Sequence, residues 1–136
     1  MVHNNVVQAA IIDKLKAYEG LAGISEEIRE ADWQGKDFTY PNVRVDLLQG
    51  IPEGDGPCED KKRPVTFGTS IRSKQKSSME CNSYGELVIA ALRGKQLSSS
   101  TFYSGKIRLR QYPGSVHNPL IEVWSLTLIW EVNVYG

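Results

Sequence analysis

The segment from Ile121 to Tyr135 constrains the fold more than any other part of the chain. Its even positions carry two tryptophans, two leucines and two valines, whereas its odd positions mix apolar and polar side chains. Strict alternation of this kind, rich in β-branched and aromatic residues, predicts a long β-strand. The even face must be buried against a helix. The residues expected there are Trp124, Leu126, Leu128 and Trp130.

The odd face of this strand carries three apolar residues, Ile121, Val123 and Ile129, among polar ones. One face of a sheet is enough to form a domain core. Apolar side chains on the other face are therefore available to something outside the domain. We expect these three residues to lie at or near contacts between subunits.

Hydrophobic spacing elsewhere predicts two main helices. Apolar residues recur every three or four positions over residues 4–18. The other main helix ends at Gly94, and its start is open between Ser77 and Ser83, because each begins a capping-box pattern. A shorter, strongly charged helix is expected over Ser25–Trp33.

Three further strands are expected over residues 42–48, 64–72 and 102–111, with a turn over 112–119 before the terminal strand. The order of elements predicts an α+β fold. It is a two-layer sandwich in which a four-stranded, mainly antiparallel sheet carries two helices on one face. At 136 residues, the chain forms a single domain, residues 1–136.

Residues 49–63 hold three glycines, two prolines and seven charges, so no packed element is expected there. We predict a long mobile loop, and long loops in compact domains are commonly functional or disordered. Its four carboxylates could chelate a hard cation, but EF-hand spacing is missing, so a solvated acidic loop is the prediction. These carboxylates belong to Glu53, Asp55, Glu59 and Asp60.

The charges balance at 16 basic and 16 acidic residues, but they are split along the chain. Residues 1–60 hold 12 acidic and 5 basic residues, a net charge of −7, while residues 61–136 hold 4 acidic and 11 basic, a net charge of +7. Two interpretations stay open. The halves form complementary surfaces on neighbouring subunits, or they interleave in space and the split vanishes.

The two cysteines, Cys58 and Cys81, form no C-x-x-C motif, which favours a reduced, cytosolic setting. No signal peptide is evident, and no apolar run approaches the roughly 18–20 residues of a membrane span. The histidines, His3 and His117, have no nucleophile or carboxylate partner placed by a motif. Zinc spacing and the common catalytic motifs are missing, so we expect neither an enzyme nor a cofactor or metal site.

Basic residues form three clusters, and the last two alternate along strand or near-strand sequence. The clusters are Lys61, Lys62 and Arg63; Arg72, Lys74 and Lys76; and Lys106, Arg108 and Arg110. One hypothesis is a nucleic-acid surface, in which the last cluster converges with Arg72 on one patch. The zero net charge and the lack of an RNP-like aromatic pattern favour a solvated sheet face or a contact with an acidic partner. Glu26, Glu27, Glu30 and Asp32 are candidates for that partner surface.

The layout resembles the tail terminator, or tail completion, proteins of long-tailed bacteriophages. The resemblance rests on VVQAAIIDKLKAY, then TYPNVRVDLL, a polar loop, VTFGTSIRS, a helix ending in ELVIAALRG, and IEVWSLTLIWEVNVY. The family has no catalytic motif, so no residue receives a role from it. The acidic segment 26–37 and the loop around Cys58 have no counterpart in that pattern.

This resemblance implies a ring, six-fold in the family, that caps the head-proximal end of the tail tube and joins it to the neck. The implied partners are other copies of the chain, the tail tube protein, a neck or head-completion protein, and a sheath if the tail is contractile. DNA would pass through the lumen without specific binding. The protein would reside in the virion, and in the host cytoplasm during assembly. A head-completion or connector protein is the alternative within this class.

Overall fold

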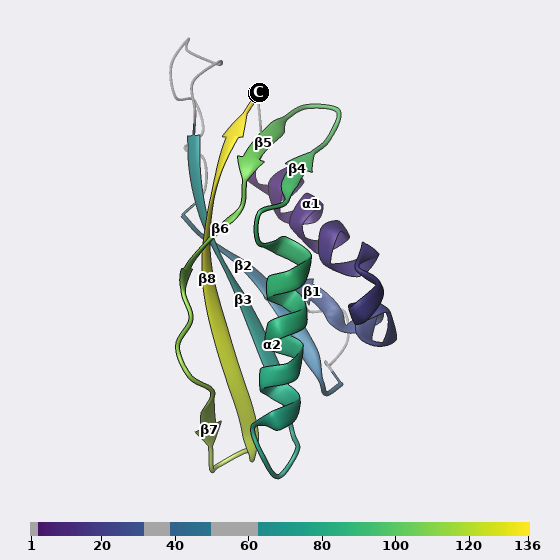
Figure 1. The fold of residues 1–136 in the computed structure, drawn as a ribbon, viewed down its shortest axis with the longest axis vertical. Helices are drawn as coiled ribbons and strands as arrows, with labels where there is room; N and C mark the ends of the chain where they lie inside the picture. Colours follow the sequence, from purple (N-terminus) through teal and green to yellow (C-terminus); the bar gives the residue numbers. More distant parts are fainter. Residues whose placement is uncertain (1–2, 32–38, 50–62) are drawn as a thin grey trace.

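A computed structural model of the chain describes residues 3–31, 39–49 and 63–136 (Figure 1). The helices are α1 (Asn4–Ala17), the 3-10 helix η1 (Glu19–Glu27) and α2 (Met79–Leu92). The strands are β1 (Ile28–Glu30), β2 (Asn42–Gln49), β3 (Arg63–Ser73), β4 (Gln96–Ser98), β5 (Tyr103–Lys106), β6 (Arg108–Gln111), β7 (Val116–Asn118) and β8 (Val123–Tyr135). The fold is α+β as predicted. The prediction of four strands and two helices is only roughly matched, because the described residues form eight strands and three helices.

Strand β8 organises the sheet. On one side it pairs with β3 over the whole length of that strand, from Arg63 opposite Val134 to Ser73 opposite Trp124. On its other side it pairs in succession with β5, β6 and β7. The order of strands across the sheet is β1-β2-β3-β8-β5-β4, with β6 and β7 also paired to β8. All described pairs are antiparallel except β1 with β2. The long predicted strand therefore holds the two halves of the sheet together.

The predicted register of β8 is confirmed. Leu126, Leu128 and Trp130 are buried, as are Val132 and Val134 further along the same face. Trp124 is half-buried rather than fully covered, because it lies near the end of β8. The Trp130 ring stacks on Phe67 of β3 with centroids 6.2 Å apart. Helices α1 and α2 close this core, and Figure 1 shows both on the same side of β3 and β8.

The short helix expected over Ser25–Trp33 is wrong in the part that the structure describes. Ser25 lies near the end of η1, and the chain then extends into β1. Ile28 is fully buried, and β1 pairs in parallel with Val43–Val45 of β2. Pairing with a neighbouring strand outweighs local helix propensity here. Trp33 lies outside the described residues.

The single strand expected over 102–111 is divided at Ile107. The Ile107 N–H donates to the Lys95 carbonyl at 2.8 Å, and the Ile107 carbonyl accepts from the Gly94 N–H at 2.9 Å. The five-residue step from Tyr103 to Arg108 faces a four-residue step from Tyr135 to Glu131 on β8. This extra residue is a bulge that breaks the alternation. The turn expected over 112–119 contains the short strand β7.

The remaining boundaries follow local signals. Helix α2 begins at Met79, between the two predicted starts, and the Ser77 hydroxyl accepts from the Met79 N–H at 3.4 Å. It ends where predicted, since Gly94 adopts a positive φ of 74°. Residues 50–62 of the predicted loop lie outside the described residues, with Cys58, Lys61 and Lys62. Among the described helices, none has the length and apolar character needed to cross a membrane.

Candidate functional site

The sheet face that points away from α1 and α2 is the candidate site, and we call it the open face. No described helix lies on it (Figure 1). Since Leu128, Trp130 and Val132 point into the core, Ile129 and Glu131 point outward on β8. The same alternation places Thr66 and Gly68 of β3 on the open face. This surface is thus built mainly from β2, β3, β6 and β8.

An apolar strip crosses the open face over Gly68. A Cβ placed on Gly68 would lie 3.6 Å from Cδ1 of Leu48 and 3.7 Å from Cδ1 of Ile129. Both side chains therefore lie next to the space above the glycine. Leu48 is 52% exposed, and Ile129 is half-buried. Ile129 was predicted as a contact residue, whereas Leu48 was missed, although the Leu47-Leu48 pair in a strand must place one leucine on each face.

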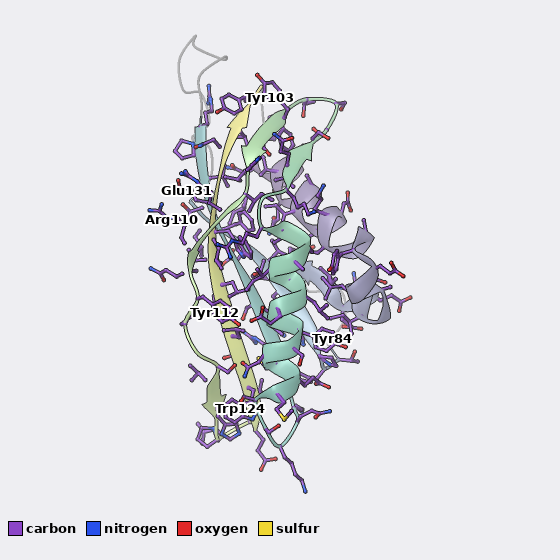
Figure 2. All side chains as sticks on the ribbon, viewed as in Figure 1. Tyr84, Tyr103, Arg110, Tyr112, Trp124 and Glu131 are labelled. Carbon is purple, nitrogen blue, oxygen red and sulfur yellow. The ribbon has the colours of Figure 1, made fainter. Side chains whose placement is uncertain are left out.

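Two tyrosines extend the apolar surface toward the end of β8. Tyr103 of β5 stacks on Tyr135 with ring centroids 5.2 Å apart and planes 15° apart. Tyr103 is 62% exposed, and Figure 2 shows it at the end of the sheet beyond Arg110 and Glu131. Exposed aromatic side chains of this kind supply contact area at low cost in conformational entropy.

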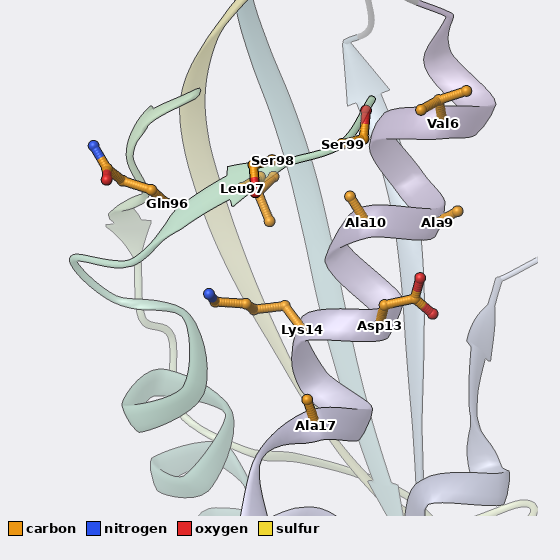
Figure 3. Close-up of a pocket in the computed structure, with 10 residues that line it drawn as sticks. All are labelled: Val6, Ala9, Ala10, Asp13, Lys14, Ala17, Gln96, Leu97, Ser98 and Ser99. Carbon is orange, nitrogen blue, oxygen red and sulfur yellow. The ribbon is translucent and has the colours of Figure 1, made fainter. Parts of the chain in front are cut away.

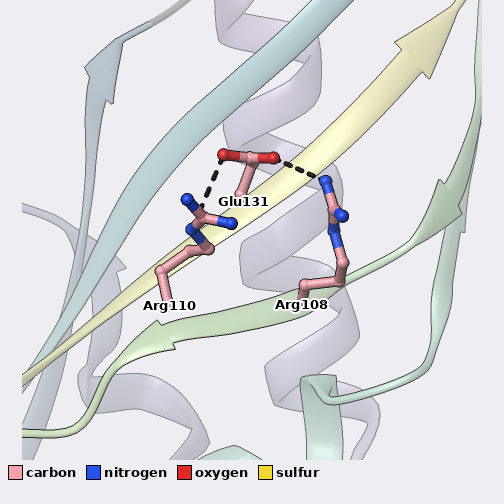
Figure 4. A network of polar contacts seen from close by, with 3 residues as sticks. All are labelled: Arg108, Arg110 and Glu131. Atoms are coloured by element: carbon pink, nitrogen blue, oxygen red, sulfur yellow. Dashed lines mark hydrogen bonds and ion pairs between the residues drawn. The ribbon is translucent and has the colours of Figure 1, made fainter.

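One carboxylate holds two of the predicted basic residues. Glu131 accepts a hydrogen bond from Arg108, and its other oxygen lies 3.8 Å from Nε of Arg110 (Figure 4). Both arginine side chains are 55% exposed, so these contacts contribute little to folding, about 0–1 kcal/mol. Arg108, Arg110 and Glu131 together leave a net charge of +1 on the open face.

Arg72 and Lys106 do not join this pair, so the single basic patch expected for nucleic acid is wrong. Thr66 is the residue of β3 opposite Glu131, and Arg72 lies six residues further along β3. At about 3.4 Å per residue this separation is about 20 Å. Arg72 instead neighbours Arg44, whose pKa is lowered by burial and then by the charge of Arg72. Lys106 precedes the bulge at Ile107, which breaks its alternation with Arg108.

The other predicted contact residues are dispersed. Ile121 lies in the exposed turn before β8, 54% exposed, beside Leu120 at 91%. Val123 is only 3% exposed, so its side chain is covered within its own chain. Arg63 opens β3 and is half-buried. Lys61 and Lys62 lie outside the described residues.

A separate groove runs between α1 and β4 (Figure 3). Its volume is about 380 Å³, and its walls are mostly small or aliphatic side chains of α1 and the short strand β4. Asp13 and Lys14 are the charged residues that line it. Neither histidine lines this groove, and His117 instead packs on Trp124 with ring centroids 4.9 Å apart. Within residues 3–31, 39–49 and 63–136, no cluster of three or more potential ligands could hold a metal ion.

Two perturbed groups lie beside α2. The Cys81 thiol is fully buried and 3.6 Å from the Ile71 carbonyl, and burial raises its pKa. The Tyr112 hydroxyl donates to Glu86 at 2.7 Å, and this hydrogen bond raises the pKa of Tyr112. Both groups stay neutral at physiological pH and act as packing and hydrogen-bonding partners.

The fold has counterparts among solved structures. One chain of the virion of a native gene transfer agent (GTA) particle superposes with a TM-score of 0.75 at 16% sequence identity, over 96% of this chain and 95% of that chain. A second solved structure, known only by an identifier, superposes with a TM-score of 0.70 at 9% identity, over 100% and 98% of the two chains. No family model matches the sequence, and comparison with curated proteins gives no match. These similarities define the fold.

Proposed function

We propose that this chain is a non-enzymatic virion assembly protein of a phage-like particle. It forms a ring, a hexamer by resemblance to the tail terminators, that caps the head-proximal end of the tail tube. The observation that carries the proposal is the fold shared, over nearly the full length of both chains, with a component of the GTA virion. On this proposal the protein resides in the virion, after assembly in the host cytoplasm.

The open face supports a subunit role. It combines the exposed Leu48, the half-buried Ile129 and the stacked Tyr103–Tyr135 pair with charged residues around Glu131. Apolar patches with polar borders are typical of surfaces that contact another protein. We assign Ile129, Arg63, Arg72, Lys106, Arg108 and Arg110 to contacts with neighbouring copies, the tail tube or the neck, together with Ile121, Lys61 and Lys62.

The proposed ring stops polymerisation of the tail tube protein and offers its other side to a neck or head-completion protein. A contractile tail would add a sheath contact. DNA passes through the lumen without specific binding, which fits the separation of Arg72 from the Arg108–Arg110 pair along β3.

Imaging of particles made without this chain tests the proposal. A terminator is required to stop the tube, so its loss is expected to give abnormally long tails, or tails that do not join heads. A head-completion or connector protein predicts tails of normal length that lie detached beside leaking heads. Normal-length tails on filled heads would contradict both roles.

A further inference from the structure

We propose that neighbouring copies of this chain join head to tail, with the hairpin tip of one copy seated in the α1–β4 groove of the next. The hairpin tip comprises Val116, Leu120, Ile121 and Glu122, at the turn between β7 and β8. The α1–β4 groove is the hollow lined by α1 and β4. This contact rests on the proposed function, because it names the two surfaces through which the copies of a ring would meet.

The hairpin tip is an exposed apolar surface. Val116, Leu120 and Ile121 are all more than half exposed, and they fall within six residues of one tight hairpin. A single exposed aliphatic side chain is ordinary on a protein surface, whereas a group of them marks a site of interaction. Burial of Leu120 and Ile121 against another protein would therefore favour association.

The backbone holds this tip in one conformation. The Leu120 N–H donates to the side-chain oxygen of Asn118 at 3.1 Å, and β7 pairs with β8 directly below the turn. Glu122 adopts a positive φ of 54°, a conformation that glycine would adopt at lower cost. The strained glutamate places a carboxylate beside Ile121 in the turn. A surface that is already ordered loses little conformational entropy when it binds.

The α1–β4 groove has the size and the lining to receive the tip. Its volume is about 380 Å³, and pockets that enclose small ligands have volumes of about 300–1,000 Å³. The groove can therefore hold a short piece of chain with two aliphatic side chains. Val6, Ala10 and Leu97 give it an apolar lining, which matches Leu120 and Ile121 in chemistry.

The two surfaces also carry complementary charges. Figure 3 shows Lys14 extending from α1 toward the side on which β4 lies, whereas Asp13 points away from it. The groove thus presents an ammonium group, and the tip presents the Glu122 carboxylate. Among the described residues, neither Lys14 nor Glu122 forms an ion pair within its own chain. A Lys14–Glu122 pair between copies would fix the register of the contact.

The tip and the groove lie at opposite ends of β8. Strand β7 pairs with the beginning of β8, at 123–125, whereas β5 pairs with its end, at Val134 and Tyr135, and β4 lies beyond β5. The 13 residues of β8 span about 40 Å at about 3.4 Å per residue. Figure 1 shows the same separation, with β7 near the bottom and β4 near the top. One copy therefore cannot place its own tip in its own groove.

A second copy of this chain is the partner that both surfaces fit. The contact is heterologous, because it joins different surfaces of the two copies, and such contacts form a closed ring when the rotation closes. A symmetric contact between two tips would bring two Glu122 carboxylates together and would leave the groove empty.

Charge reversal on each surface tests the contact. Lys14→Glu changes the groove and Glu122→Lys changes the tip, and both side chains are at least partly exposed, so the variants should fold. Lys16→Glu makes the same charge change in the last turn of α1 but outside the groove, and it is the matched control. Sedimentation velocity and native mass spectrometry report the oligomeric state.

We expect the wild type and the Lys16→Glu control to form the same oligomer. Lys14→Glu or Glu122→Lys alone should associate about tenfold more weakly, which corresponds to about 1.4 kcal/mol. A chain with both reversals should recover most of the association, because the two charges attract again with their signs exchanged. A symmetric contact between tips would give no recovery.

Two further variants separate the contact from folding. Leu120→Ser with Ile121→Ser removes the apolar side chains at exposed positions, so it should weaken association about tenfold or more with little change in thermal unfolding. Glu122→Gly relieves the positive φ, so it should weaken association without lowering the thermal midpoint. A tip that serves only to stabilise the fold would lose thermal stability and association together.

The proposed contact is ruled out if the wild type stays monomeric at all concentrations, or if the single reversals assemble like the wild type. It is also ruled out if the double reversal assembles no better than either single one. Tip variants that form normal oligomers but fail to join tails would rule it out as well and would assign the tip to another virion protein. In each case, tail length in particles that lack the chain still decides the proposed function.

Discussion

The indole N–H of Trp130 donates a 2.9 Å hydrogen bond to the Thr69 hydroxyl, across the buried face of the sheet between β8 and β3. The two residues are 61 positions apart and both are fully buried. A tryptophan in a core needs a partner for its N–H, since an unsatisfied buried donor costs about 1–3 kcal/mol. Thr69 is the residue that lets the strand pair bury its largest side chain.

We therefore expect Thr69→Val to lower the free energy of unfolding by about 1–3 kcal/mol, although the two side chains are similar in size. The measurement is equilibrium denaturation in urea. Trp130→Phe removes the donor and leaves a small cavity, so it is also destabilising. If the hydrogen bond causes the destabilisation, the double variant loses less free energy of unfolding than the sum of the losses in the two single variants. Strict additivity would contradict this account.

A second prediction concerns the contact between α2 and β8. A Cβ on Gly85 would lie 2.5 Å from Cδ2 of Leu126, which is buried. Glycine to alanine normally stabilises a helix interior by up to about 1 kcal/mol. Here we expect Gly85→Ala to destabilise the fold by about 1–3 kcal/mol through overpacking.

Ser83→Ala, at an exposed position of the same helix, is the control and should change stability little. Adding Leu126→Val to Gly85→Ala should restore part of the lost stability, because valine lacks the Cδ2 atom that clashes. A Gly85→Ala variant as stable as the wild type in thermal unfolding would show that α2 does not pack this closely.

The third prediction concerns Cys81. Its thiol is buried and its pKa is raised above the ordinary value of 9.0, so the neutral form is favoured in the folded state. Because the folded pKa is the higher one, the stabilising contribution is fully present below about pH 9 and is lost as the pH rises through the folded pKa. In a Cys58→Ser variant, we expect a thiol reagent to react with Cys81 only on unfolding. Rapid reaction of the native protein at neutral pH would contradict this.

The sequence predicts the central part of the fold because β8 is long. Alternation over so many residues specifies which side chains enter the core, and Leu126, Leu128 and Trp130 do so. Short strands carry no such signal. Strand β1 forms because β2 is available to pair with it, and β7 forms because β8 extends far enough to meet it. These pairings depend on tertiary structure that no local pattern contains.

The candidate site was less predictable for a related reason. Arg108 and Arg110 share a partner on the open face, as alternation suggests. Lys106 does not alternate regularly with Arg108, because the backbone of Ile107 between them forms hydrogen bonds with Gly94 and Lys95 after α2. No local sequence pattern reveals this contact. Leu48 was overlooked because it is the last residue of the strand expected over 42–48 and was assigned to neither face. The structure shows that it borders Ile129 on the open face.

The fourth prediction concerns nucleic acid. Because Glu131 partly neutralises Arg108 and Arg110, and because Arg72 lies about 20 Å away along β3, we expect no mobility shift of double-stranded DNA at low salt. Glu131→Gln removes the neutralising charge and is the informative comparison. A strong, salt-dependent shift of the wild type would instead favour the nucleic-acid hypothesis.

A reconstruction of the intact particle would show directly whether this chain caps the tail tube. We expect a closed ring of copies, six by resemblance to the tail terminators, seated between the last ring of the tail tube and the neck. Density for the chain elsewhere in the particle, or its absence from finished particles, would rule out a tail terminator.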